Sequence, residues 1–381
     1  MRKKTIIFFG ILIVVITLSF GVITAGCAPK EKAKLSIITF KGYAEDEWVK
    51  PFEEKYNCTV EVTYIGTIDE CFGKVSAAPD QYNLVSIDSG RAQLYYSAGL
   101  IKDIDISKLK NYNKLGDYFK NSTQTEMEKG KKFHIPIVWG SLNFLVNMET
   151  AGEDIKPYLK DASNGTQTLS SSVIKDPKFA NRVAIMDDTS NVLAVAAISL
   201  GLKEPYNLNS EDGWVKVTDE LNKWIKNFRT FTSGMDSEVQ AITSGDVDLV
   251  FGGNDAIDAL TMTDQGVMDK YKFFLPTEGV VVWIDGFALT KNTTGATLDL
   301  AQKYIDYIIS DEGQQKLAKL IGFGPTNLAG ASGLSDVTRK ETPWYAEGLD
   351  KVPVPVFIMS ADEDPGKRVK IWTDIKASIG K

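Results

Sequence analysis

The pattern of apolar and polar positions predicts strands that alternate with helices. Leu35–Phe40 is an apolar, β-branched run and predicts a buried strand. Apolar residues recur at helical spacing from about Glu45 to Tyr56, and Val60–Tyr64 alternates as a strand does. The same reading predicts a helix over 69–77, a strand over 82–87 and a helix over 91–98. This succession predicts a mostly parallel sheet with helices on both faces.

A second series follows the long apolar segment Ile135–Asn147, which is interrupted at Gly140. At 381 residues the chain is too long for one ordinary core, so we expect two domains and interpret this segment as strands that cross between them. The second series comprises a strand over 182–186, helices over 192–200, 211–228 and 237–244, and a strand over 247–251. Strand 280–289 then returns to the first domain, followed by helices 296–309 and 312–321, an extended segment 352–358 and a helix over 367–379.

The strand 280–289 carries the first candidate chemistry. Trp283 and Asp285 are two residues apart, so their side chains point to the same face, and Gly286 leaves room beside them. A ring face next to a carboxylate is suited to an organic cation. The alternative is that Trp283 is a core residue and Asp285 merely ends the strand.

The loops after the first and third strands are expected to lie at one rim of the first sheet. Ligands of such sheets bind beyond the carboxyl ends of the strands. This places 40–43 and 88–91 near a ligand.

The N-terminal residues have a composition of their own. Basic residues at positions 2–4 precede the apolar run Ile6–Phe20, and small residues lead to Cys27. The order resembles a bacterial lipoprotein signal, so we expect residues 1–26 to be removed and Cys27 to carry a lipid. An uncut membrane anchor is the alternative, because the apolar run is nearly long enough to span a bilayer. In both cases the domain faces the outside of the cytoplasmic membrane, at the cell surface or in the periplasm.

The charge of the chain argues against a nucleic-acid partner. The formal net charge is −7, and removing residues 1–26 would take away three positive charges and no negative one. An acidic exported domain repels phosphate backbones.

The cysteines and the histidine indicate no special chemistry. Cys58 opens a strand and Cys71 lies in the next helix, on the order of 20 Å away by strand rise, which is too far for a disulfide. We therefore predict two free, buried thiols. His134 is the only histidine and offers no metal or triad constellation, so we expect no metal and no cofactor.

Four segments of the chain carry motifs, among them Trp139-Gly140, the pair Trp283 and Asp285, and Ile321-Gly322-Phe323. Together these segments resemble the polyamine-binding (spermidine/putrescine) subgroup of the bacterial solute-binding proteins that serve ABC transporters. The segments, in the same order as in the family, are Ile135–Asn147, Gly245–Ala256, Val281–Asn292 and Ala301–Ala329.

The resemblance implies an α/β, two-lobed periplasmic-binding-protein fold of type II. Each lobe would be a mostly parallel sheet flanked by helices, with a hinge of crossing strands and a ligand in the cleft. We expect a tether over 27–34, a first lobe from 35–142 and 286–328, and a second lobe from 143–285 and 329–381.

By resemblance, five positions are candidate ligand-binding residues. Trp283 and Asp285 fall on the pocket pair of the family, Asp188 on its second-lobe aspartate, and Phe40 and Tyr43 on its first-loop aromatics. Asp188 precedes a helix and could instead cap it.

Departures from the family pattern give a second group of candidates. Lys41-Gly42 replaces Thr-Glu, Arg91 follows Gly90 near an expected tyrosine, and Asn191 replaces an acidic residue. A family tryptophan after the strand ending at Phe251 is Gly252 here. The second group comprises Lys41, Arg91, Asn191 and Asp255. The alternative role of Lys41 and Arg91 is that of solvated surface charges, and the alternative role of Asp255 is capping.

The sequence thus predicts a lipid-anchored, monomeric receptor that delivers spermidine/putrescine-type polyamines to an ABC permease and its ATPase. The loss of acidic and aromatic positions keeps a smaller cation or a zwitterion open as the ligand. An extracellular hydrolase is the first rival, but one histidine and no GxSxG or HExxH pattern argue against an enzyme. A surface sensor or adhesin with the same fold is the second rival.

Overall fold

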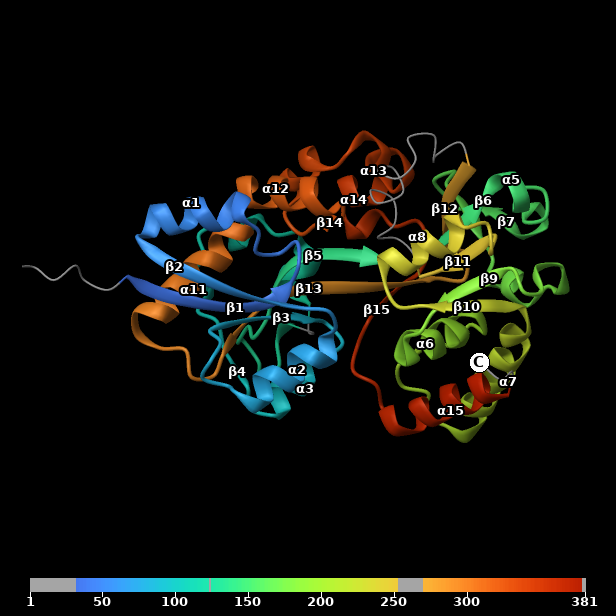
Figure 1. The fold of residues 1–381 in the computed structure, drawn as a ribbon, viewed down its shortest axis with the longest axis horizontal. Coiled ribbons are helices and arrows are strands. Elements are labelled where there is room, and N and C mark those ends of the chain that lie inside the picture. The colour runs from blue at the N-terminus through green and yellow to red at the C-terminus, as the bar shows by residue number, and fades with distance from the viewer. Residues whose placement is uncertain (1–31, 123–124, 253–269, 379–381) are drawn as a thin grey trace, which may run out of the picture. The chain divides into compact units, whose positions relative to one another are not determined.

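Two β-sheets organise the part of the chain that the computed structural model describes, which is residues 32–122, 125–252 and 270–378. Residues Ala33–Lys381 form one unit. Figure 1 shows the strands of the two sheets with helices packed around each of them. None of the helices in the described ranges is both long and apolar enough to cross a membrane.

The first sheet has the order β14-β5-β13-β3-β1-β2, and β4 and β15 also pair with β13. Parallel pairs join β1 to β2, β1 to β3 and β13 to β15, and the remaining pairs are antiparallel. Its strands are β1 (Ala33–Phe40), β2 (Cys58–Ile65), β3 (Leu84–Asp88), β4 (Ile101–Lys102), β5 (Ile135–Ser141), β13 (Val280–Thr290), β14 (Gly324–Pro325) and β15 (Val356–Ile358).

The second sheet has the order β10-β9-β11-β6-β12-β8-β7. It is mixed as well, because β6 and β7 run antiparallel to their neighbours. Its strands are β6 (Phe144–Asn147), β7 (Leu159–Asp161), β8 (Gln167–Leu169), β9 (Val183–Met186), β10 (Phe228–Thr232), β11 (Leu249–Phe251) and β12 (Tyr271–Pro276).

Helices cover both faces of each sheet. The helices that pack with the first sheet are α1 (Asp46–Tyr56), α2 (Ile68–Ala77), α3 (Ala92–Ser97), α4 (Asp117–Asn121), α11 (Gly295–Ile308), α12 (Asp311–Ile321) and α14 (Pro343–Glu347). Helix α13 (Asp336–Glu341) packs on α14, and its Val337 contacts a core cluster of the second sheet. Those of the second sheet are α5 (Met148–Ala151), α6 (Thr189–Ser199), α7 (Glu211–Trp224), α8 (Met235–Thr243) and α15 (Pro365–Ala377).

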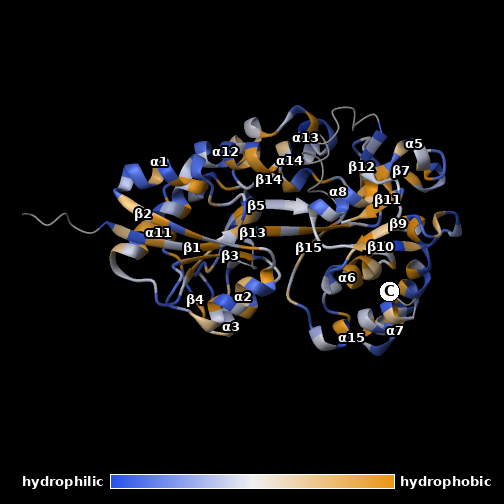
Figure 2. Cartoon of the chain, in the orientation of Figure 1, coloured by the Kyte–Doolittle hydropathy of each residue, from blue (hydrophilic) through white to orange (hydrophobic). Residues whose placement is uncertain are grey.

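The sequence explains why these helices form and how they pack. In α12 the side chain of Ser310 caps the first turn, and Gly322 ends the helix with a left-handed φ of 71°. Helix α6 is apolar on all sides and every residue from Asn191 to Ile198 is buried, as expected of a helix enclosed in a core. Figure 2 shows hydrophobic residues along strands such as β11 and β13, whereas α1 mixes both kinds.

The chain passes between the sheets at 142–143, where β5 leads to β6, and again at 277–279, where β12 leads to β13. A third connection, 359–364, leads from β15 to α15, which packs on α6 and α7. Strand β13 touches both cores, because Val281 belongs to the core of the second sheet and Val282 to that of the first.

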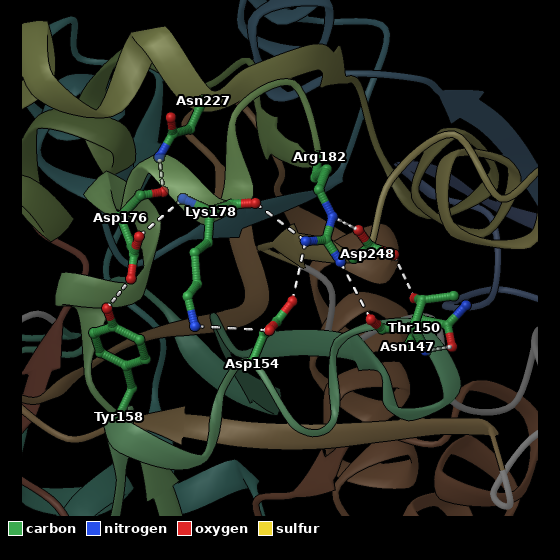
Figure 3. A network of polar contacts seen from close by, with 9 residues as sticks. All are labelled: Asn147, Thr150, Asp154, Tyr158, Asp176, Lys178, Arg182, Asn227 and Asp248. Carbon is green, nitrogen blue, oxygen red and sulfur yellow. Dashed lines mark hydrogen bonds and ion pairs between the residues drawn. The ribbon is translucent and has the colours of Figure 1, made fainter.

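A network of polar contacts holds the second sheet together at the start of β9, around Arg182. Arg182 donates hydrogen bonds to the carboxylates of Asp248 and Asp154 and to the backbone oxygen of Thr150, as Figure 3 shows. Asp248 also accepts a hydrogen bond from the hydroxyl of Thr150. The network therefore ties β9 to β11 and to α5, about 20 Å along the strand direction from Asp188 at the other end of β9.

Several sequence predictions differ from the structure. The sheets are mixed, because the crossing segments run antiparallel to their neighbours. The segment Ile135–Asn147 breaks at 142–143 and not at Gly140, and the helix expected over 211–228 ends at Trp224, so that β10 was missed. The prediction of two free, buried cysteines, Cys58 and Cys71, is confirmed. All of Val280–Thr290 belongs to the first sheet, and the predicted lobe boundaries stay predictions.

Candidate ligand-binding cavity

Residues from both sheets line a cavity of about 670 Å³. This volume lies in the range of small-molecule sites. The predicted residues that line it are Phe40, Lys41, Tyr43, Asp188, Asn191, Trp283 and Asp285.

Strand β13 presents Trp283 and Asp285 to the cavity. They are the only two residues of this strand that are not fully buried, and the alternation of strand side chains puts them on one face. The ring of Phe323 meets the indole of Trp283 edge-on at 4.9 Å between centroids. The hydroxyl of Tyr43 donates a hydrogen bond to Oδ2 of Asp285 at 2.6 Å. One aromatic wall and one oriented carboxylate therefore come from this strand and the first loop.

Asp88, at the end of β3, lies directly opposite Asp285 in the antiparallel pair of β3 and β13. Residues in such positions share a face and have Cβ atoms about 5 Å apart. Both line the cavity. The backbone N–H of Arg91 donates to Oδ1 of Asp88 at 2.9 Å. The structure thus places two carboxylates side by side where like charges repel each other.

Asp188 brings a third carboxylate from the second sheet. It is the residue before α6 and caps this helix, because its Oδ1 accepts a hydrogen bond from the backbone N–H of Asn191 at 3.0 Å. The side-chain amide of Asn191 donates to the other oxygen, Oδ2, at 3.0 Å. Asp188 therefore caps α6 and lines the cavity at the same time.

The cavity raises the pKa of two of these carboxyl groups. The pKa of Asp88 is raised first by burial and further by the negative charge of Asp188, against the opposing effect of Arg91. The pKa of Asp188 is raised by burial, although hydrogen bonds from Asn191 and the charge of Arg91 oppose the shift. Asp188 is exposed to water, but it lines the cavity and the adjoining hollow, and the protein atoms around these hollows account for the penalty on its charge.

The two predicted bases have different positions. Lys41 lines the cavity, is exposed, and has no hydrogen bond or ion pair among the described residues. Arg91 does not line this cavity but lies in an adjoining hollow of about 750 Å³, which it shares with Asp188. Its Nη2 atom is 3.6 Å from the carboxylate of Asp69.

Three acidic residues of the cavity were not singled out from the sequence. Asp88 ends a parallel strand at the predicted rim, which is a signal that could have found it. Asp187 lines the cavity but already pairs with Lys376 at 2.8 Å, and Glu238 is buried in the cavity wall. Glu238 and Lys376 reach this place from distant elements, so no local pattern indicates them.

Three further sequence expectations concern Asp255, Cys27 and Gly286. Asp255 and Cys27 lie outside the described residues. Gly286 does not leave room for a ligand: a Cβ atom there would come 2.2 Å from the backbone oxygen of Ile135 and 2.4 Å from Nε2 of His134. The missing side chain makes room for β5 and for this buried histidine, whose pKa burial lowers to about 4.

Comparisons with known proteins agree with this architecture. The family model described as bacterial extracellular solute-binding protein matches residues 47–342. A spermidine/putrescine-binding periplasmic protein of Haemophilus influenzae is 23% identical over 299 residues, which is 77% of this chain and 75% of that protein. A putrescine/cadaverine-binding protein of Pseudomonas aeruginosa is 22% identical over 374 residues, 96% of this chain and 98% of that protein.

One solved structure with the same fold is the spermidine/putrescine ABC transporter substrate-binding protein PotD of Streptococcus pneumoniae. Its TM-score is 0.72 at 18% identity, and the match covers 91% of this chain and 99% of that chain. A lipoprotein of Treponema pallidum has a TM-score of 0.72 and 20% identity over 90% of this chain and 99% of that chain. The predicted two-lobed periplasmic-binding-protein fold is therefore confirmed.

Proposed function

This chain belongs to the bacterial extracellular solute-binding proteins, and we propose that it captures a small organic di-cation of the putrescine type for an ABC importer. Proteins of this family bind solutes, and the chain is not an enzyme. Relatives named for spermidine, putrescine and cadaverine support an amine as the ligand.

The opposition of Asp88 and Asp285 is the observation that carries the proposal. Two carboxylates on directly opposite strand positions repel each other unless a cation lies between them. Asp188 adds a third negative charge from the side of the second sheet, and this charge raises the pKa of Asp88. An ammonium group near these oxygens would relieve the repulsion and gain charge-assisted hydrogen bonds.

Aromatic side chains complete the site for an alkyl diamine. Trp283 and Phe323 form one wall, and Phe40 and Tyr43 meet edge-on at 6.2 Å between centroids on another. Ring faces attract ammonium groups and cover methylene groups, each contact contributing about 0.5–2 kcal/mol when water is excluded. Because the carboxylates come from both sheets, a bound diamine favours the conformation in which both reach it.

Lys41 favours a second candidate ligand. Its ammonium group lines the cavity and no carboxylate pairs with it among the described residues. A zwitterion such as γ-aminobutyrate could place its ammonium group at Asp88 and Asp285 and its carboxylate at Lys41.

Calorimetric titration of the purified protein with putrescine, spermidine, γ-aminobutyrate and betaine tests the proposal. We expect putrescine to bind, and Asp285→Asn to weaken it at least tenfold, because a hydrogen bond to a charged group contributes about 1.5–3 kcal/mol. Asp117→Asn is the matched control, since Asp117 is 90% exposed and pairs only with Lys120 among the described residues. Binding of γ-aminobutyrate alone would select the second candidate, and no binding by any of the four compounds would refute the proposal.

The remaining parts of the proposal concern location and partners. We place the protein outside the cytoplasmic membrane, anchored by a lipid on Cys27, as a monomer that delivers its ligand to a permease and its ATPase. Mass spectrometry of the membrane-bound protein would test the anchor, since the proposed mature form begins at Cys27 and carries a diacylglyceryl group on its sulfur.

A further inference from the structure

A chain of three side chains leads from the cavity into the core of the second sheet. Asp188 accepts a hydrogen bond from the side-chain amide of Asn191 at 3.0 Å, and Oδ1 of the same amide accepts one from the hydroxyl of Tyr206 at 2.6 Å. We propose that Tyr206 is a positioning residue for the ligand-binding carboxylate of Asp188 and acts through the amide of Asn191. The role of Asp188 as a ligand-binding group rests on the proposed function.

The amide of Asn191 is held from both sides. Asn191 and Tyr206 are each 3% exposed, so water does not replace a lost partner. The charged carboxylate of Asp188 can only accept a hydrogen bond, so the amide nitrogen faces it, and the amide oxygen then faces the hydroxyl of Tyr206, which donates to it. The hydroxyl thus holds the amide in the position from which it donates to Asp188. The geometry of that hydrogen bond therefore depends on a residue that does not line the cavity.

Arg368 of α15 fixes the position of Tyr206. Its guanidinium group is fully buried, donates to the backbone oxygen of Pro205 at 2.9 Å and lies 5.9 Å from the ring centroid of Tyr206. It also pairs with Asp362 at 3.1 Å. Asp362 in turn accepts a hydrogen bond from the hydroxyl of Ser190 in the first turn of α6. The support of Asp188 thus extends to the connection 359–364 that joins β15 to α15.

Several charged groups surround Asp188 and contribute to its titration. Asp88 and Arg91 face it from the first sheet, and Asp362 with Arg368 from the connection 359–364 and α15. Its own element adds Asp187, which pairs with Lys376. The other acidic groups of the cavity are Glu238 and Asp285. All of these charged groups are retained when Tyr206 is replaced by phenylalanine.

Removing the hydroxyl has a defined consequence for Asp188. In Tyr206→Phe the amide oxygen of Asn191 loses its donor in a buried place, so Asp188 alone holds the amide, its position is less well fixed and its donation to Asp188 weakens. A carboxylate that loses a donor is stabilised less in its charged form, and its pKa rises. Tyr206 itself stays protonated, because burial and the neighbouring carboxylates raise its pKa well above the ordinary value.

The titration of Asp188 in the ligand-free full chain tests the inference. The ¹³C shift of its carboxyl group, assigned by comparison with Asp188→Asn, is followed against pH in the unmodified protein, in Tyr206→Phe and in Tyr158→Phe. Tyr158 is the matched control, because its hydroxyl donates to the carboxylate of Asp176 (Figure 3), and neither residue lines the cavity. We expect a rise of about half a pH unit or more in Tyr206→Phe alone, the size of a partial loss of one hydrogen bond. An unchanged titration would overturn the inference.

A double-mutant cycle with putrescine separates positioning from general destabilisation. Tyr206→Phe should weaken putrescine severalfold in the unmodified background and not at all in the Asp188→Asn background. An equal loss in both backgrounds would contradict action through Asp188. If Asp188→Asn leaves putrescine binding unchanged, Asp188 is not part of the proposed ligand site, and the titration of Asp188 still decides whether Tyr206 positions it.

Discussion

At the residue scale, the site combines groups that oppose folding in the absence of ligand. Asp88 and Asp285 face each other across β3 and β13. Burial, and further the charge of Asp188, raise the pKa of Asp88, so its charged form is disfavoured in the fold. The same two charges are what an organic cation requires. Stability and ligand affinity should therefore respond in opposite directions when one charge is removed.

The substitution Asp88→Asn should stabilise the ligand-free protein by about 0.5–1 kcal/mol, the usual size of a cross-strand like-charge repulsion. The amide oxygen can still accept the hydrogen bond from the backbone N–H of Arg91. Putrescine should bind at least tenfold more weakly, because one charge-assisted partner is lost. Urea unfolding and calorimetry measure the two effects. Asp117→Asn is again the control, since Asp117 is 90% exposed, and a destabilised Asp88→Asn protein would contradict the argument.

The affinity for putrescine and the free energy of unfolding of the ligand-free protein should depend on pH in opposite ways above about pH 4, the ordinary pKa of aspartate. Because the folded-state pKa values of Asp88 and Asp188 are raised, the folded protein binds protons more tightly than the unfolded chain. Their contribution to stability is therefore largest below pH 4 and is lost as the pH rises through the raised values. Affinity should rise over the same interval, since the ligand requires the charged carboxylates.

Calorimetry in buffers of different ionisation enthalpy measures this proton linkage. We expect protons to be released on putrescine binding in the interval just above pH 4. Proton uptake on binding in that interval would show that the ligand does not engage these carboxylates.

The sequence could identify only part of the site at this scale. Trp283 and Asp285 were found because the period of a strand puts residues two apart on one face. The opposition of Asp88 and Asp285 depends on the register between strands that lie nearly two hundred positions apart, which no local pattern contains. Arg91 was a possible ligand-binding residue, with a solvated charge as its alternative role; it lines the adjoining hollow and not the cavity, and its role stays a prediction.

At the element scale, β13 organises the molecule, because it pairs with β3, β4, β5 and β15 and touches both cores. The register between β13 and β5 shifts at Gly286. The backbone oxygen of Ile135 approaches this glycine so closely that no side chain fits. The position of Asp285 thus depends on a glycine next to it.

The substitution Gly286→Ala should destabilise the protein by at least about 2 kcal/mol, since the added methyl group meets backbone atoms that cannot move aside. Gly73→Ala is the matched control. Gly73 lies inside α2, and a Cβ atom added there would meet no other atom within 4 Å, so this change should stabilise by about 0.5–1 kcal/mol through helix propensity. Urea unfolding of both variants measures the contrast, and equal stabilities would refute the steric argument.

Element types were predictable where the periodicity is long and the ends are marked. The bounds of α12 follow from Ser310 and Gly322, and α1 and α2 lie within one residue of the expected ranges. Strand β10 was missed because Phe228 continues the apolar face of the preceding helix, and only its pairing with β9 makes it a strand. The mixed sheets were missed because antiparallel pairing arises from crossing segments whose direction a sequence does not state.

At the scale of the whole molecule, the ligand site is distributed over both sheets. Asp88 and Asp285 belong to the first sheet, and Asp188 begins a helix that packs in the second. A ligand that contacts all three is stabilised only when both parts contribute. A free ligand concentration of one hundred times the dissociation constant adds about 2.7 kcal/mol to the free energy of unfolding. The regions around both sheets should share this gain.

Hydrogen exchange with and without putrescine tests this sharing. We expect slower amide exchange at the cavity ends of β3 and β13 and also in the first turn of α6, because the ligand holds both together. In Asp188→Asn at saturating putrescine, protection should persist at β3 and β13 and disappear from α6, since the contact to the second sheet is lost. If the protection from exchange in Asp188→Asn stays equal at both places, the ligand reaches the second sheet through other groups. If the protection in the unmodified protein is confined to the first sheet, the ligand does not bridge the two sheets.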